Sequence, residues 1–327
     1  MLHSFKRGKS VIIKKQSLQM NYLSHAALIK RIDPMNPKFQ QIQNNFMRAR
    51  SGVWGEESID YYLSNYHHPY PHLILQDVHL FANSYFQIDN LFITQFFILV
   101  IEVKNIKGNI ELTQKPFDLI RTNELVEKMS LYSPEEQLEK NVLWLNDWLR
   151  NKGWTIPVKG IIVFTNMESH ITVNESTCSV IKGKHLPTWI RKMEHTKEYL
   201  TVDQMNELAE EINTNHTDYK HKSILERYQL TKEEIKIGVQ CPECFEFGMK
   251  KHRRHWSCSN NHQSVDAHLK TLDDYFYIFG MSITNKECRR FLQIENVHVS
   301  KRLLTSMDLH ISGKTKRREY VKMFRGN

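Results

Sequence analysis

The fold of this chain is decided by residues 87–104, which read QIDNLFITQFFILVIEVK. Two runs within this stretch, 87–94 and 98–104, are rich in apolar, β-branched and aromatic residues and predict two strands. If the strands pair as a tight hairpin, only Gln95 and Phe96 need lie in the turn. The stretch therefore predicts an antiparallel pair with a defined register.

That register places the carboxylates of Asp89 and Glu102 opposite each other. Directly opposed side chains lie roughly 5 Å apart at Cβ, and like charges there destabilise a sheet. A divalent cation removes the conflict, because hard cations take carboxylate oxygens. Lys104, two residues beyond Glu102, shares its face of the strand. One face thus carries two metal ligands and an ammonium group, a set suited to phosphodiester cleavage. The alternative is an ordinary solvated face, although apolar residues flank Glu102 closely.

Further elements complete the order α-β-β-β-α-β. A helix begins near Glu56, whose side chain can face inward at the start of that helix. A second helix begins at Pro134, which suits a first turn, and Gln137 near its start can point into the site. The supporting patterns are helical spacing at Ile59, Tyr62, Leu63 and Tyr66, a strand over 73–80, helical spacing at Leu138, Val142, Leu145 and Leu149, and a buried strand over 158–164.

These motifs resemble the nuclease-related domain, NERD, of the PD-(D/E)xK nuclease superfamily. The family shows a Gly-x-x-Gly-Glu helix start, a Gln-Ile-Asp strand, an Ile-Glu-x-Lys strand followed by Gly, and a later Pro-x-x-Gln helix. The chain carries these pieces, in order, as Gly52-Val53-Trp54-Gly55-Glu56, Gln87-Ile88-Asp89, Ile101-Glu102-Val103-Lys104-Asn105-Ile106-Lys107-Gly108 and Pro134-Glu135-Glu136-Gln137. The resemblance covers roughly residues 45–165 and implies a restriction-endonuclease-like α/β core.

The resemblance also implies a metal-dependent endonuclease that hydrolyses DNA. Asp89 and Glu102 would bind Mg²⁺ or Mn²⁺, aided by the backbone carbonyl of Val103. Glu56 would be an accessory ligand, directly or through water.

Two further residues take implied roles around these ligands. Lys104 would orient the attacking water or neutralise the developing charge, and Gln137 would position Lys104 or the substrate phosphate. One alternative is an inert NERD scaffold that acts as a DNA-binding regulatory or replication accessory protein, against which the intact Asp89, Glu102 and Lys104 set argues. Another is an RNA nuclease, because nothing in the residues decides the sugar.

The chain has 327 residues, of which 40% are hydrophobic and 25% charged, as in an ordinary chain of two or three domains. The longest apolar run, Leu91 to Val103, contains Glu102 and is too short and too polar to span a membrane. The N-terminus is basic and lacks an apolar signal segment, so we expect a cytoplasmic protein. No feature indicates an oligomeric state.

The positive charge is concentrated towards the C-terminus. The net charge is +9, and residues 221–327 hold 20 Lys and Arg against 12 Asp and Glu. A basic region beside a nuclease suggests contact with a polyanion, and a plain solvated surface is the alternative. The expected organisation is a basic N-terminal arm over 1–45 with one helix, a nuclease-like domain over 46–213, a linker over 214–237, a zinc-ribbon-like module over 238–265 and a winged-helix-like tail over 266–327.

The cysteine spacing predicts a structural zinc site. Cys241 and Cys244 form a Cys-x-x-Cys knuckle, and Cys258 follows at the distance found in zinc ribbons. His262 would be the fourth ligand, and His255 is a second candidate for that position. Such a site fits a reducing compartment better than a disulfide framework does. The alternative is a degenerate ribbon that has lost its metal.

The tail predicts three helices and a hairpin with a basic tip, as in a winged helix-turn-helix. The helices start near Asp266, at a Thr284/Glu287 capping box and at Asn296. The third helix would enter the major groove and the hairpin would touch phosphates, unless the tail is a helical domain for protein contacts. The residues predicted to touch nucleic acid are His298, Lys301, Arg302, Lys314, Lys316, Arg317 and Arg318, and those predicted to be buried in the first helix are Leu269, Leu272, Phe276 and Phe279.

Overall fold

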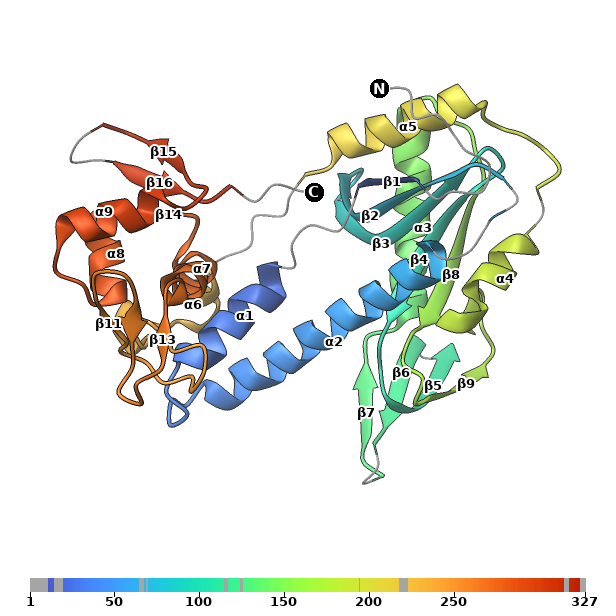
Figure 1. Ribbon diagram of the computed structural model, residues 1–327. Helices are drawn as coiled ribbons and strands as arrows, with labels where there is room; N and C mark the ends of the chain where they lie inside the picture. Colours follow the sequence, from blue (N-terminus) through green and yellow to red (C-terminus); the bar gives the residue numbers. More distant parts are fainter. Residues whose placement is uncertain are drawn as a thin grey trace. The chain divides into compact units, whose positions relative to one another are not determined.

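The computed structural model divides the chain into two compact units (Figure 1). The first comprises Met1–Ser17 and Ser51–Tyr219, and the second comprises Leu18–Arg50 and Lys220–Asn327. The boundary falls within helix α2 (Phe39–Ser64). The structure describes residues 11–14, 20–64, 68, 70–114, 117–123, 126–193, 195–217, 223–314 and 318–323.

The first unit is built on a six-stranded sheet of order β1-β2-β3-β4-β8-β10. Strands β2, β3 and β4 are antiparallel neighbours, whereas β8 runs parallel to β4, and β10 runs parallel to β8. Strand β1 pairs in parallel with β2 at the other edge. The bounds are β1 Val11–Lys14, β2 His72–Phe81, β3 Tyr85–Thr94, β4 Ile98–Lys104, β8 Val158–Phe164 and β10 Ser179–Lys182.

Helices cover both faces of this sheet (Figure 1). Helices α3 (Pro134–Asn151) and α5 (Val202–Asn215) pack on one face, and the C-terminal part of α2 and α4 (Leu186–Arg191) pack on the other. Successive strand residues point to opposite faces, so the apolar run of β4 can fill both cores. The central strands are therefore buried on both sides.

The predicted hairpin is confirmed by the pairing of β3 with β4. Asn90 pairs with Ile101, and Ile93 pairs with Ile98. The turn needs no glycine, because Thr94 Oγ1 accepts hydrogen bonds from the backbone N–H groups of Phe96 (3.1 Å) and Phe97 (2.9 Å). The side chain of Thr94 thus closes the turn.

The predicted element order α-β-β-β-α-β is present as α2, β2, β3, β4, α3 and β8. The expected start of the first helix near Glu56 is wrong, because α2 begins at Phe39 and Glu56 lies within it. A second sheet of order β7-β6-β5-β9, which we did not predict, is attached to it. Three of its strands lie in the chain between β4 and α3, and the fourth follows β8. They are β5 Gly108–Gln114, β6 Phe117–Thr122, β7 Lys128–Leu131 and β9 Ser169–Asn174.

The second unit contains short sheets and several helices. Its first three-stranded sheet has the order β11-β12-β13, with Cys241 and Cys244 before β11 and Cys258 directly after β12. Its C-terminal part follows the order helix, strand, helix, helix, strand, strand, and its three strands form an antiparallel sheet of order β14-β16-β15. The bounds are β11 Lys250–Lys251, β12 Trp256–Ser257, β13 Gln263–Ser264, α7 Ala267–Phe279, β14 Ser282–Thr284, α8 Asn285–Leu292, α9 Val297–Thr305, β15 His310–Ser312 and β16 Glu319–Val321.

The predicted helix starts in this unit are confirmed by their caps. Thr284 and Glu287 form a capping box at α8, and the Asn296 side chain accepts hydrogen bonds from two backbone N–H groups at the start of α9. Gly280 ends α7 with φ +114°. One expectation for α7 is wrong: Leu269 is exposed, and the core side of the helix carries Thr271 and Tyr275 in addition to the predicted apolar residues.

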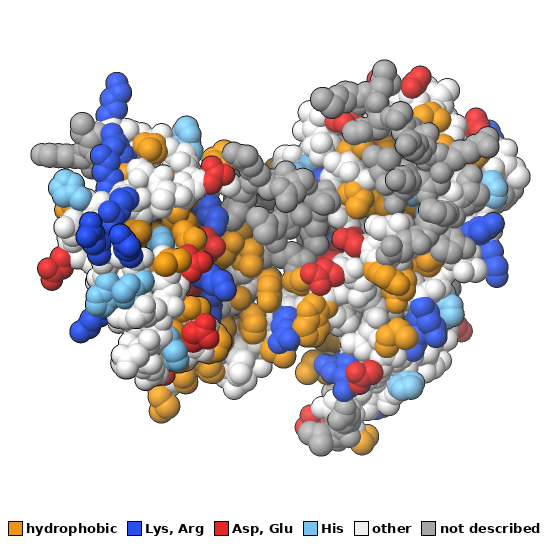
Figure 2. Space-filling view, in the orientation of Figure 1, with side chains coloured by type: hydrophobic (Ala, Val, Ile, Leu, Met, Phe, Trp, Pro, Cys, Tyr) orange, Lys and Arg blue, Asp and Glu red, His pale blue; other side chains and the backbone are white. Residues whose placement is uncertain are grey.

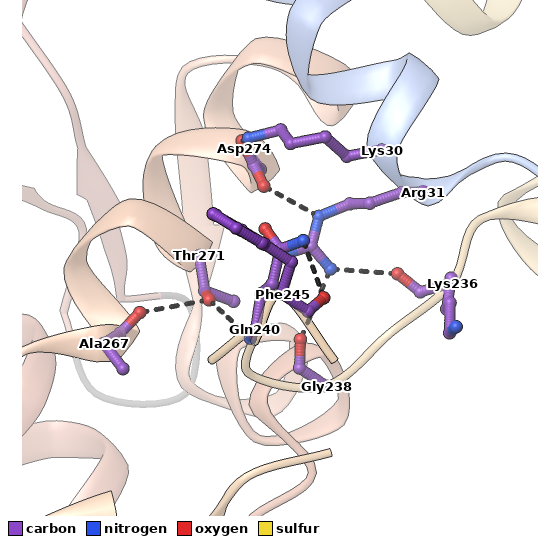
Figure 3. A network of polar contacts seen from close by, with 9 residues as sticks. All are labelled: Lys30, Arg31, Lys236, Gly238, Gln240, Phe245, Ala267, Thr271 and Asp274. Atoms are coloured by element: carbon purple, nitrogen blue, oxygen red, sulfur yellow. Dashed lines mark hydrogen bonds and ion pairs between the residues drawn. The ribbon is translucent and has the colours of Figure 1, made fainter. Parts of the chain in front are cut away.

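Residues 20–31, expected to belong to a basic arm, form helix α1 (Met20–Arg31), which is anchored in the second unit. Arg31 is fully buried, and its Nε lies 3.0 Å from Asp274 Oδ2 on α7 (Figure 3). Its Nη1 donates to the carbonyl oxygens of Lys236 (2.9 Å) and Gly238 (3.3 Å). The guanidinium also lies over the rings of Phe247 and Phe291, at 4.8 and 4.6 Å. A buried cation needs such partners, and they fix α1 in place.

The segment expected to be a linker, 214–237, contributes to the same core. It contains helix α6 (Ile224–Tyr228), which opens with a Ser223/Glu226 capping box. The Tyr228 hydroxyl contacts His25 Nε2 of α1 at 2.8 Å. Charged residues surround these core positions in the sequence, which is why the segment resembles a linker. The buried side chains are Ile224, Leu225, Tyr228, Leu230 and Ile235.

Among the helices that the structure describes, none combines the length and the apolar character required to cross a membrane.

Candidate functional site

The hairpin brings Asp89 of β3 close to Glu102 of β4. Asp89 lies one residue before the Asn90–Ile101 pair, and its Oδ2 accepts a hydrogen bond of 2.9 Å from the backbone N–H of Val103. Asp89 is half-buried, whereas Glu102 is only 1% exposed. The two carboxylates therefore lie at the end of the β3–β4 ladder, within the first unit.

Lys104 is held between two oxygen atoms. Its Nζ lies 2.7 Å from Glu102 Oε1 and donates to Gln137 Oε1 of α3 at 3.1 Å. Gln137 is near the start of α3 because Ser133 caps that helix and Pro134 opens it. The Lys104 side chain is 22% exposed, so the ammonium group can reach a bound molecule.

The second carboxylate oxygen of Glu102 has an unusual environment. Among the described residues, no group forms a hydrogen bond with the buried Glu102 Oε2. Burial, and then the nearby Asp89 charge, raise the pKa of Glu102 to about 8, although Lys104 opposes the shift. Burial also raises the pKa of Asp89, against the effects of Lys104 and the Val103 N–H. An unpaired buried oxygen beside a second carboxylate fits a cation.

Glu56 on α2 belongs to the same electrostatic cluster. Burial, and then the charges of Asp89, Asp77 and Asp60, raise its pKa to about 8. Each of these carboxylates disfavours the ionisation of the others, so a bound cation would stabilise the whole cluster. Glu56 is half-buried at the position where the sequence predicts an inward-facing side chain.

Asp77 on β2 is a member of this cluster that the sequence analysis missed. Gln76 pairs with Asn90 and Val78 pairs with Ile88, so Asp77 occupies the position opposite Asp89. Its φ is +51°, and its Oδ1 contacts His79 Nε2 at 2.8 Å. A carboxylate within the apolar strand 73–80 was the available signal, but an ordinary edge position explains such a residue equally well.

The donor set of the site suits Mg²⁺ or Mn²⁺ without forming a closed cage. Mg²⁺ is usually bound through one or two carboxylates, with water and substrate phosphates completing the shell. Asp89 and Glu102 provide two such carboxylates. In the part of the chain that the structure describes, ligand atoms from three or more Asp, Glu, His or Cys residues gather within 4.8 Å only in the second unit.

That group consists of Cys241, Cys244, Cys258 and His262. His262 Nδ1 lies 3.7 Å from Cys241 Sγ and 3.5 Å from Cys258 Sγ, and the Sγ atoms of Cys244 and Cys258 are 3.8 Å apart. Three sulfur atoms and one imidazole at these separations can bind a metal ion such as zinc. The set contains the predicted His262 and not the alternative His255.

Local backbone geometry produces the two knuckles of this cluster. Phe245 and Asn261, one in each knuckle, have φ values of +61° and +62°. Asn tolerates this left-handed conformation, which explains an Asn in the second knuckle. The Glu246 backbone N–H and the His262 ring lower the pKa of Cys244 to about 6, whereas burial raises the pKa of Cys241.

The residues predicted to touch nucleic acid lie in the C-terminal part of the second unit. His298, Lys301 and Arg302 are exposed on α9, and Lys314 is exposed after β15. Arg318 is half-buried, and Lys316 and Arg317 lie outside the described residues. Lys and Arg side chains gather on one face of this unit (Figure 2).

The comparisons with known proteins agree with the geometry of the first unit. An α/β sheet whose adjacent strands present two carboxylates and a lysine defines a nuclease-like class of protein. Residues 51–165 match the family model of the nuclease-related domain, which identifies a NERD-like domain in this part of the chain. Searches of curated proteins and of solved structures gave no match. A nuclease-related domain indicates a nuclease-related function with a nucleic acid as the substrate class.

Proposed function

We propose that this protein is a metal-dependent endonuclease that hydrolyses DNA phosphodiester bonds and binds DNA through its C-terminal region. The observation that carries the proposal is the buried Glu102 Oε2, which has no hydrogen-bond partner in the described part of the chain and lies beside Asp89 and Lys104. Most buried polar atoms have a hydrogen-bond partner, and a cation is a suitable partner for an unpaired carboxylate oxygen that lies beside a second carboxylate.

Asp89 and Glu102 would hold the Mg²⁺ or Mn²⁺ ion, with the Val103 carbonyl as a third ligand and Glu56 as an accessory ligand. When bound, such a cation supplies a water of lowered pKa and stabilises the charge on the transferring phosphate. The Val103 N–H bond fixes the Asp89 carboxylate, so that its other oxygen can face the ion.

Lys104 would act on the substrate side of the site. Its ammonium group is fixed by Glu102 and Gln137, and it would orient the attacking water or neutralise the charge that develops on the phosphate. Gln137 would act through Lys104 and is therefore a positioning residue.

The second unit would supply DNA binding. The order α7, β14, α8, α9, β15, β16 is that of a winged helix, with α9 as the recognition helix and the β15–β16 hairpin as the wing. The exposed side chains His298, Lys301 and Arg302 on α9 support this assignment. The Cys₃His cluster would hold one structural Zn²⁺, which would fix the ribbon on the same core.

The proposal is tested by incubating full-length protein with supercoiled, linear and single-stranded DNA, and with RNA, in the presence of Mg²⁺, Mn²⁺ or EDTA. We expect nicking and linearisation of supercoiled DNA with either cation and none with EDTA. If the protein cleaves RNA and none of the DNA substrates, the protein is an RNA nuclease. Absence of cleavage of every substrate, with retained DNA binding, would support an inert scaffold that acts as a regulatory or accessory protein.

A further inference from the structure

The tip of the zinc-ribbon hairpin is a tight turn with two arginines at its centre. The backbone N–H of His252 donates to the carbonyl of His255 at 2.8 Å, and the turn leaves Arg253 and Arg254 exposed. The two histidine rings stack, with centroids 4.9 Å apart at 22°. The backbone therefore presents both guanidinium groups to solvent.

The base of this turn is fixed by Lys251. Its Nζ donates to the carbonyls of His252 (2.7 Å) and His255 (3.4 Å) and lies 5.5 Å from the centre of the Trp256 ring. Trp256 is fully buried, and its Nε1 donates to His268 Nδ1 of α7 at 3.2 Å. The turn is thus attached to the core of the second unit and is not a free loop.

The same core supports helix α9. Trp256 and Met249 of the ribbon belong to one buried cluster with Leu303 and Leu304 of α9. Burial, and then the charge of Arg302, lower the pKa of Lys251, so these two cations repel each other. The ribbon tip and the exposed side of α9 therefore carry neighbouring positive charges.

Several of these positive charges lack an ion-pair partner among the described residues. Arg302 on α9 and the two tip arginines form no ion pair with any residue that the structure describes, in contrast to Arg290, which lies 3.2 Å from Glu233. Like charges brought together on a folded surface repel, and a polyanion relieves the repulsion. The exposed cations that share this property are Lys250, Arg253, Arg254, Lys301 and Arg302.

We propose that the ribbon turn His252–His255 is a second DNA contact, which grips the phosphate backbone of the duplex whose major groove receives α9. Arg253 and Arg254 bind phosphate oxygens and fix the register of α9 without reading bases. The ligand is duplex DNA because α9 is a helix, and a helix fits a major groove about 12 Å wide. This inference rests on the proposed DNA binding by α9.

The test measures binding of full-length, zinc-loaded protein to a duplex and to a single strand of equal length, at several salt concentrations without added Mg²⁺ or Mn²⁺. Three double variants are compared with the parent: Arg253→Ala/Arg254→Ala at the tip, Lys301→Ala/Arg302→Ala on α9, and Arg191→Ala/Lys192→Ala as a control. The control removes an adjacent, exposed basic pair at the C-terminal end of α4 in the first unit, namely its last residue and its C-cap. Zinc content and thermal unfolding verify that each variant is folded.

We expect the tip variant to make the slope of log K against log salt on duplex DNA shallower by about 1.8, because each phosphate contact contributes roughly 0.9. The α9 variant should also lose duplex affinity, and the control should match the parent. An unchanged slope for the tip variant, with a loss for the α9 variant, overturns this inference alone. Parental binding by both variants overturns the DNA-binding role of α9 as well. If the tip variant loses as much affinity for single-stranded DNA as for duplex DNA, the ribbon turn and α9 do not contact one duplex together, and the inference is wrong.

Discussion

Lys104 Nζ lies 2.7 Å from Glu102 Oε1, two residues away on the same strand. The same ammonium group also donates a hydrogen bond to Gln137 Oε1 of α3. The ion pair occupies one oxygen of Glu102 and leaves the other, Oε2, directed into a buried space without a hydrogen-bond partner among the described residues. One carboxylate can therefore fix the lysine and bind a cation at the same time.

Replacing Glu102 with Gln should abolish cleavage while the protein remains folded. The amide keeps the volume of the side chain but lacks the charge that binds the cation, and a metal ion supplies several kcal/mol of transition-state stabilisation. We expect a fall in the nicking rate of roughly a thousandfold, which corresponds to about 4 kcal/mol. The rate of plasmid nicking under Mn²⁺ measures this fall, with circular dichroism as the folding control. A variant that nicks at the parental rate would show that Glu102 does not bind the catalytic cation.

Lys104→Ala should reduce cleavage and leave Mn²⁺ affinity largely intact, because the ammonium group acts on the water or the phosphate rather than on the ion. Gln137→Ala should give a smaller loss, since Lys104 keeps its contact with Glu102. Loss of a single positioned donor costs on the order of 10²–10³ in rate. Single-turnover rates and calorimetric Mn²⁺ titration separate the two effects. A lysine variant that loses metal binding would show that Lys104 maintains the carboxylates instead.

Metal affinity should rise with pH between about 5 and 8. In the metal-free folded state the pKa of Glu102 is raised from its ordinary value of 4.5 to about 8, so between these values the folded protein holds a proton that the unfolded chain has released. This site therefore lowers the stability of the metal-free protein as pH rises, and the cation must displace the proton at lower pH. We expect a gain of roughly tenfold in affinity per pH unit up to about 8.

Calorimetry of Mn²⁺ binding in buffers of different ionisation enthalpy measures this proton release. Glu102→Gln should no longer bind the cation, so it serves as the control for heat and proton release that do not come from this site. An affinity that is independent of pH, with no proton released, would show that the carboxylates are already ionised without the cation.

Protein purified without added zinc should contain one zinc ion per chain. Substituting His262→Ala should lower the zinc content and destabilise the second unit, because the ion would link the two knuckles. His255→Ala is the control, since His255 is not part of the ligand cluster, and it should retain the metal. Elemental analysis and thermal unfolding decide; a His262 variant with full zinc content would refute the ligand assignment.

Arg31→Met should destabilise the second unit by roughly 3–5 kcal/mol, because among the described residues it leaves the buried Asp274 with only Lys30 as an ion-pair partner. The methionine retains most of the packing between Phe247 and Phe291. Denaturant unfolding, monitored for each unit by hydrogen exchange, measures the effect. The exposed Arg191→Met is the control and should change stability by less than about 0.5 kcal/mol. An effect as small as that of the control would mean that other contacts hold α1 in place.

Short-range patterns in the sequence determine much of this protein. Glu102 and Lys104 share a face because strand side chains alternate, and the tight turn closed by Thr94 then brings Asp89 beside them. The capping boxes at Thr201 and Thr284 also depend on residues three positions apart. The grouping of Cys241, Cys244, Cys258 and His262 was predicted because knuckle spacing is a local property.

Tertiary structure alone decided the features that join distant segments. Arg31 is a core residue because Asp274 and two phenylalanines, more than 200 positions away, surround it, and the hydropathy of α1 gives no sign of this. Asp77 joins the acidic cluster because β2 pairs with β3, and a strand pattern alone does not show which residue lies opposite it. The choice of His262 over His255 likewise depended on the path of the second knuckle. Local pattern specifies each element, but burial and partner choice depend on long-range packing, whose free energy no local sequence window contains.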